Sequence, residues 1–166
     1  MGHTPKQRKA SPDTPVSREI GAADQLRHPT NRTAFAYWER IKGARPMPGR
    51  ADIDPSEIVG ILPCVFLLDV GLEPLDFRYR LIGTKMSNHM NRDHTGAWMS
   101  EIEHQRAPSR IWTACERVVT RQVPLSSDTP YVGKLHEFKT TEDLIMPLSE
   151  DGKTVNMLFV TADFLS

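Results

Sequence analysis

A nine-residue stretch in the first third of the chain, RADIDPSEI at residues 50–58, gathers an arginine and three carboxylates. Carboxylates at this density can hold a hard metal ion or work as an acid–base pair. The same stretch also fits a helix start, with Asp54 as N-cap, a proline in the first helical position and Glu57 closing a capping box. Because these independent preferences agree, we predict a structural corner, with Arg50 and Asp52 as a polar clasp. A partner-binding role for that pair stays open.

Histidines are the second residue type in the chain that could do chemistry. His89 and His94 flank Asp93 in NHMNRDHTG, and such a set could bind a metal ion. Their i,i+5 spacing differs from the i,i+4 pair of a zinc-binding helix, and the segment has no helical periodicity. We therefore predict exposed loop histidines. His104 and His136 each stand alone, which is a weak signal for a haem ligand.

Nucleophile and phosphate-binding motifs do not occur in the sequence. It contains no G-x-S-x-G, no glycine-rich phosphate loop and no cysteine with a convincing histidine partner. The two cysteines, Cys64 and Cys115, sit among apolar neighbours and are predicted to be reduced core residues. These observations favour a protein that is not an enzyme.

Length and charge set the class of protein. A chain of 166 residues fits one domain, and its 21 basic and 21 acidic residues cancel. Without a net field, binding to nucleic acid or to an anionic membrane is not expected. No apolar run approaches the roughly 18 residues that cross a bilayer, and the N-terminus lacks a signal-peptide core. We therefore expect a cytoplasmic protein.

The elements that must position these residues follow from patterning. Residues 1–27 are rich in proline, serine, threonine and charge, which predicts a disordered tail before a domain at residues 28–166. A helix is predicted from Asn31 to Gly43, with Phe35 and Trp38 on its apolar stripe. The tail has only a small excess of basic residues, so it does not indicate a nucleic-acid arm.

The rest of the chain reads as an α+β domain. Residues 64–83 predict a hairpin whose second strand alternates apolar residues with Arg78 and Arg80. A long helix is expected at residues 108–123. Three strand candidates follow: YVGKLHEF, EDLIMPL and TVNMLFVTADF. Together they predict a five-stranded antiparallel sheet with helices on one face.

Apolar and sulfur-containing side chains lie on the elements that should face one another. Such a set is more often plain core than a ligand pocket, but because methionine packs adaptably it is a candidate for a small pocket. The candidate ligand-binding residues are Tyr79, Leu81, Met90, Trp112, Cys115, Met146 and Met157.

An ordered series of motifs resembles a known family. The stretches are YWERIKGARPMPGRADIDP, LPCVFLLDV, FRYRLIGT, RDHTG and LIMPLSEDG. They resemble the signature of the bacterial PAS domains called PAS_5, which are common in alphaproteobacteria. The blocks cover the whole predicted domain, and the third strand is the loosest match.

The resemblance implies a PAS fold with sheet order 2-1-5-4-3. It implies a sensory or interaction module that binds a small ligand or a signalling partner such as a histidine kinase, and that forms homodimers. No output domain follows Ser166, so we expect a stand-alone module. The chain lacks the reactive-cysteine motif of light-sensing flavin members and a haem histidine on the long helix, so neither cofactor is expected.

Two alternatives remain open at this point. A small cone-shaped enzyme of the ketosteroid-isomerase type has a similar length and would use Asp52 or Asp69 as its base. A structural dimer would pack Phe35 and Trp38 against a partner subunit. Strand order separates the first alternative from the PAS fold.

Overall fold

The sheet of the molecule has six antiparallel strands in the order β1-β4-β5-β6-β2-β3. The computed structural model describes residues 17–90, 92–132 and 138–165. The strands are β1 Ser17–Glu19, β2 Val65–Leu72, β3 Leu75–Ile82, β4 Leu125–Val132, β5 Phe138–Leu148 and β6 Met157–Leu165. The last five have the spatial order of the predicted 2-1-5-4-3 sheet, which confirms the PAS fold. The strand β1 adds one more edge beyond β4.

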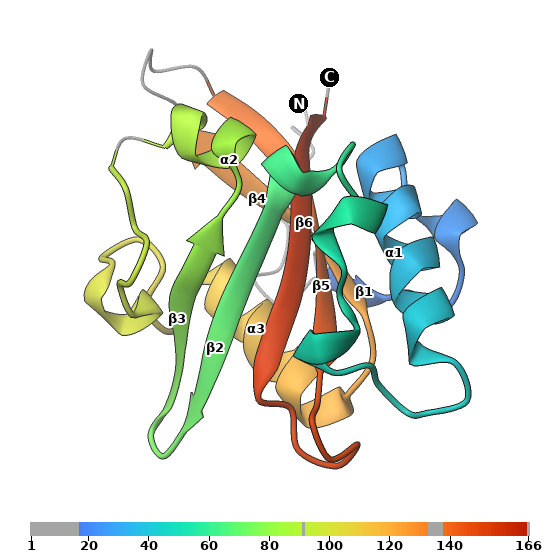
Figure 1. The fold of residues 1–166 in the computed structure, drawn as a ribbon. Helices are drawn as coiled ribbons and strands as arrows, with labels where there is room; N and C mark the ends of the chain where they lie inside the picture. Colours follow the sequence, from blue (N-terminus) through green and yellow to red (C-terminus); the bar gives the residue numbers. More distant parts are fainter. Residues whose placement is uncertain (1–16, 91, 133–137, 166) are drawn as a thin grey trace, which may run out of the picture.

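Helices cover both faces of this sheet (Figure 1). They are α1 Pro29–Lys42, α2 Thr84–His89 and α3 Arg110–Arg121. α3 packs on β4 and β5 from one side, while α1 packs on β5 and β6 from the other. Five short 3₁₀ turns complete the connections: Ala23–Gln25, Arg50–Asp52, Pro55–Glu57, Leu62–Cys64 and Met99–Glu101. No helix in the described ranges is long and apolar enough to cross a membrane.

The helix α1 forms where the sequence predicts it, with caps at both ends. His28 is the N-cap and accepts a hydrogen bond from the Thr30 amide, and Gly43 ends the helix with a positive φ of 58°. Phe35 and Trp38 are both 3% exposed, and the Trp38 indole donates to the Pro147 carbonyl over 3.0 Å. The hypothesis that these aromatic residues pack against a partner is therefore wrong, because the chain's own sheet covers them.

The RADIDPSEI corner consists of two short 3₁₀ turns rather than the start of a longer helix, and the expected helix start is the second of them, Pro55–Glu57. Asp54 caps it as predicted and accepts from the Ser56 amide at 3.0 Å. The predicted capping box is wrong, because the Asp54 amide donates to the Tyr37 hydroxyl at 2.8 Å. Glu57 instead pairs with Arg40 of α1 at 2.9 Å. The stretch is thus attached to α1 by Tyr37 and Arg40, which lie outside the capping motif that the sequence shows.

The polar clasp at this corner also has a different partner from the one expected. Asp52 pairs with Arg45 at 2.9 Å and accepts from the Gly49 amide at 2.7 Å. These contacts lower the pKa of Asp52, the backbone hydrogen bond more than the arginine. The acid is therefore a structural anion at a loop corner.

Residues 17–27 do not belong to a disordered tail. Ser17 pairs with Ser127 and Glu19 with Leu125 along the β1–β4 ladder. Leu26 is 2% exposed in the core, and Glu19 pairs with Arg121 at 2.8 Å. The composition of this segment is too polar to predict a core element, and the sheet edge supplies its hydrogen-bond partners. Residues 1–16 lie outside the described residues.

Gly83 marks a close approach between β3 and the turn before β2. A Cβ at this position would lie 2.5 Å from the Pro63 carbonyl oxygen and would also collide with that of Leu62. We expect Gly83→Ala to lower the free energy of unfolding by about 1–3 kcal/mol, because the backbone itself must move. Urea unfolding measures the loss. Gly60→Ala is the matched control, since its Cβ would meet no atom within 4 Å. Equal effects of the two substitutions would contradict the expectation.

Candidate ligand cavity

A cavity of about 570 Å³ lies between the sheet and the start of α3. Its walls are mostly apolar, and its volume falls in the range of small-molecule sites. The apolar part of the lining comes from β2, β3, β6 and α3 and includes Phe66, Leu68, Tyr79, Ile111, Val160 and Ala162. Met86 of α2 and Met90 just after it close a further side. The sequence thus folds into a pocket in the place that the PAS resemblance implies.

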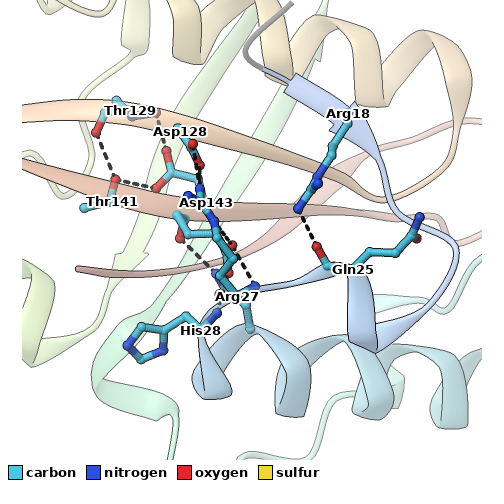
Figure 2. A network of polar contacts seen from close by, with 10 residues as sticks. Arg18, Gln25, Arg27, His28, Asp128, Thr129, Thr141 and Asp143 are labelled. Carbon is cyan, nitrogen blue, oxygen red and sulfur yellow. Dashed lines mark hydrogen bonds and ion pairs between the residues drawn. The ribbon is translucent and has the colours of Figure 1, made fainter. Parts of the chain in front are cut away.

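One carboxyl group, that of Asp143 on β5, faces this cavity. Asp143 is only 6% exposed. The hydroxyl of Thr141 donates to one of its oxygens at 2.8 Å, and that of Thr129 donates to the other (Figure 2). Both threonines also line the cavity. Two hydroxyl donors therefore hold the carboxyl group in a fixed orientation on the pocket wall.

The environment of Asp143 disfavours its charge. Burial raises its pKa to about 7, and the hydrogen bonds from Thr129 and Thr141 offset only part of that effect. The charges of Asp128 and Glu142 contribute a smaller part of this rise in the pKa. No ion pair joins Asp143 to a cation within the described ranges. A carboxyl group with a pKa near neutrality in a cavity is characteristic of functional sites.

Aromatic and histidine rings form a further part of the lining. The Tyr79 hydroxyl donates to Gln105 at 2.5 Å, and its ring stacks on His94 with centroids 6.3 Å apart. Burial lowers the pKa of His94, and the nearby charge of His104 adds to this effect. His94 is therefore neutral at neutral pH. His89 and His104 complete the histidines of the lining.

Two of the seven predicted ligand-binding residues line the cavity, Tyr79 and Met90. Met146 and Met157 instead lie on the other face of the sheet. Met146 stands opposite Phe159, whereas the cavity residues Asp143 and Ala162 stand opposite each other. Directly paired residues share a face and successive residues alternate, so the two methionines point toward α1.

The other three predicted residues also lie outside the lining. Trp112 packs edge-on against Phe77, with centroids 5.1 Å apart, and Cys115 is fully buried. Leu81 is 42% exposed. A bulge between Leu67 and Leu68 places Tyr79 opposite Leu68 but Leu81 opposite Leu67. The alternation predicted for β3 is therefore broken, and Leu81 leaves the face that Tyr79 occupies. Binding by the predicted set as a whole remains a prediction.

Sequence reasoning missed the polar half of the site. Asp143 sits next to Glu142 at the start of the apolar run LIMPL. Two adjacent acids entering a buried strand must point to opposite faces, and each then needs a partner. That pattern could have identified both residues. His89, His94 and His104 were predicted as exposed or isolated, and only the tertiary fold brings them to one cavity. No described group of three or more possible ligands could hold a metal ion.

Glu142 binds the N-terminal segment on the face of β5 opposite the cavity. Its side chain is completely buried and accepts hydrogen bonds from the backbone amides of Arg27 and His28, each at 2.9 Å. The side-chain amide of Asn31 donates to the Glu142 carboxylate at 3.1 Å, and the Arg27 guanidinium lies 3.3 Å from it. Burial raises the pKa of Glu142, but these hydrogen bonds outweigh it and the net shift is downward.

A second carboxylate holds α1 from β6. Asp163 accepts from the Thr30 hydroxyl at 2.9 Å and pairs with Lys85 at 2.7 Å. Cys64, a free and buried cysteine as predicted, donates its thiol to the same carboxylate. The start of α1 is thus attached to β5 and β6, and the opposite face of these strands contributes to the cavity lining.

The two bases of the alternative enzyme hypothesis lie elsewhere. Asp69 on β2 pairs with Arg78 at 2.9 Å and with Arg80 at 3.5 Å. Asp52 pairs with Arg45, and neither acid lines the cavity. The strand order is that of a PAS domain, so the cone-shaped fold is wrong.

Known proteins place the fold in a family. The PAS domain family PAS_5 matches residues 26–160. Among solved structures, the chain is similar to a sensory box histidine kinase/response regulator from Burkholderia thailandensis E264. The two share 8% identity and a TM-score of 0.42 over 68% of this chain and 85% of that chain. No curated protein matches the chain. Because the family match covers most of the chain, including α1, α3 and the strands β2 to β5, this chain belongs to the PAS_5 family of PAS domains, which are sensory and signalling modules.

Proposed function

We propose that this PAS domain binds a small molecule in the cavity between the sheet and α3 and reports its presence through α1. The observation that carries the proposal is the pair of adjacent acids on β5. Asp143 faces the cavity, while Glu142 holds the first residues of α1 on the other side. Because successive strand residues alternate, a small rotation of β5 on ligand binding moves both side chains.

The partner in this proposal is a signalling protein, with a histidine kinase as the favoured class because PAS domains commonly serve such kinases. The module itself carries out no catalysis and acts in the cytoplasm. Homodimer formation stays part of the proposal. A dimer contact would use surfaces other than Phe35 and Trp38, which the chain's own sheet buries.

Hydrogen exchange tests the link between cavity and helix. A metabolite screen by thermal shift identifies compounds that stabilise the protein, and a ligand at a hundred times its Kd stabilises by about 2.7 kcal/mol. We expect such a compound to change amide exchange in β5 and in residues 28–42 of α1. Ala162→Phe, which fills part of the cavity, should abolish both effects. A compound that occupies the cavity while α1 exchange stays unchanged would rule out the reporting role.

A further inference from the structure

Among the described residues, Asp143 has no cationic partner, unlike the other buried carboxylates of the sheet. Glu142 has Arg27 at 3.3 Å, and Asp163 has Lys85 at 2.7 Å. Asp143 is comparably buried, yet its partners in the described part of the chain are the hydroxyls of Thr129 and Thr141. Burying a carboxylate without a positive charge beside it costs free energy. A cationic group of a ligand in the cavity would supply the charge that Asp143 lacks among the described residues.

The two threonines favour the acceptor form of Asp143. Each carboxyl oxygen accepts one hydroxyl hydrogen bond, which stabilises the ionised state. A carboxylate has lone pairs beyond these two bonds, and on the cavity side an occupant can supply the further donors. The group is therefore prepared to accept hydrogen bonds from a ligand.

The remaining walls suit the body of an organic cation. The rings of Phe66 and Tyr79 and the side chains of Leu68 and Val160 offer apolar surface around the carboxyl group. Aromatic faces also attract a cation directly when water is excluded. His94 on the facing wall is neutral at neutral pH, because burial lowers its pKa. An ammonium group near Asp143 thus meets an opposite charge and several aromatic or apolar groups, while Arg110, which also lines the cavity, is exposed to solvent.

We propose that the cavity selects a small organic cation, an alkylammonium with an aromatic or alicyclic body, whose charged nitrogen binds the Asp143 carboxylate. The inference rests on the proposed sensory function and specifies the ligand class for the same cavity. Free inorganic cations lack the apolar body that the walls accept. Carboxylates would place a like charge beside Asp143.

Matched probes test the ligand class. Tryptamine, phenethylamine and cyclohexylmethylamine are each compared with the alcohol that replaces the ammonium by a hydroxyl, and with indole-3-acetate as an anion. Calorimetry and ligand-observed NMR on the full chain give the affinities. We expect at least one amine to bind at least tenfold more tightly than its alcohol, and the anion not to bind. Equal or tighter binding of the alcohols or the anion, or no binding by any amine, would overturn the proposal.

The pH dependence of binding identifies the group responsible. The pKa of Asp143 is affected by the charges of Asp128 and Glu142 and by hydrogen bonds from Thr129 and Thr141. The charge of Asp143 in turn raises the pKa values of Tyr79 and Cys115. With a pKa of about 7, the carboxyl ionises between pH 6 and 8, so amine affinity should rise about tenfold over that range. His94, His104, His89 and Arg110 also line the cavity, so the profile is read against a variant.

Asp143→Asn is that variant, and it should remove both the preference for amine over alcohol and most of the pH dependence. Asp69→Asn is the matched control, because Asp69 lies on the sheet outside the cavity and pairs with Arg78. Unchanged amine preference in a folded Asp143→Asn protein would assign recognition to another group and overturn the proposal. If alcohols or the anion bind and shift α1 exchange, the ligand class is wrong but the sensory function stands. If amines bind and amide exchange in α1 does not change, the ligand class is correct but the proposed reporting through α1 is wrong.

Discussion

Glu142→Gln is expected to lower the free energy of unfolding by about 2–4 kcal/mol at pH 7. One carboxylate oxygen accepts from the Arg27 amide and the other from the His28 amide. A glutamine has a single oxygen, so in either orientation its NH₂ group faces a backbone donor. The mismatch is buried and water cannot relieve it. Urea unfolding followed by far-UV circular dichroism measures the loss.

The loss should be local in hydrogen exchange and dependent on pH. Amides near Thr30 and Asn31 at the start of α1 should lose protection before those of β5, because Glu142 attaches that end of the helix. The pKa of Glu142 is lowered in the folded state, so its contribution is complete above the unfolded value of 4.5. It is lost as the pH falls through the lower folded value, and the variant should then approach the wild type.

Glu57→Gln provides the matched control for this substitution. Glu57 also pairs with an arginine, Arg40 at 2.9 Å, but its side chain is 39% exposed and that of Arg40 is 60% exposed. Water screens such a pair, so the change should stay within about 0.5 kcal/mol. A loss at Glu142 no larger than the loss at Glu57 would show that the buried acid does not hold α1.

The second large effect concerns the pH dependence of stability in the Asp143→Asn variant. Asp143 has a folded pKa of about 7 and an ordinary value of 3.8. Between these values the folded wild type holds a proton that the unfolded chain has lost, so its stability falls as the pH rises from about 4 to 7. Asparagine does not titrate. Relative to wild type, the variant should therefore gain up to about 4 kcal/mol over this range.

Asp163→Asn should show the opposite sign and serves as the control. Asp163 is also buried on the sheet, but its pKa is lowered, because Lys85, the Phe164 amide and Thr30 outweigh the effect of burial. Its contribution is present above pH 3.8 and is lost as the pH falls through the folded value. Unfolding curves of both variants and wild type at several pH values make the comparison, from pH 4 to 8 for Asp143 and below pH 4 for Asp163, whose lowered pKa places its effect there. Parallel pH profiles for Asp143→Asn and wild type would contradict an elevated pKa at Asp143.

The helices α1 and α3 and the strands β2, β3, β5 and β6 could be predicted because their signals are local. The strand expected at YVGKLHEF falls largely on residues 133–137, outside the described residues, and β4 Leu125–Val132 and the helix α2 were not predicted. The amphipathic stripe and terminal glycine of α1, the alternation in β3 and the caps of α3 depend on near neighbours in the sequence. The PAS order of the strands followed from a series of motifs in the same order along the chain. By contrast, the segment at residues 17–27 is ordered by the edge of β4, which lies about a hundred positions away.

The candidate site was predicted only in part, for a related reason. Tyr79 and Met90 line the cavity as expected. When helices cover both faces of a sheet, however, the alternation of apolar residues along a central strand does not show which face meets the cavity. Met146 was therefore placed on the wrong face. Leu81 was misplaced because a single bulge reverses the alternation after Tyr79.

The sequence by itself determined the PAS fold, the position of α1 and the structural role of the RADIDPSEI corner, because local capping, periodicity and motif order carry that information. Only the tertiary structure determines the protonation states of Asp143 and Glu142. Asp143 and Glu142 are adjacent carboxylates in one strand. Asp143 faces a cavity and has no ion-pair partner among the described residues, whereas Glu142 accepts hydrogen bonds from two backbone amides. Their ionisation depends on burial and on tertiary partners, which for Glu142 lie more than a hundred residues away, and neither can be read from neighbouring residues.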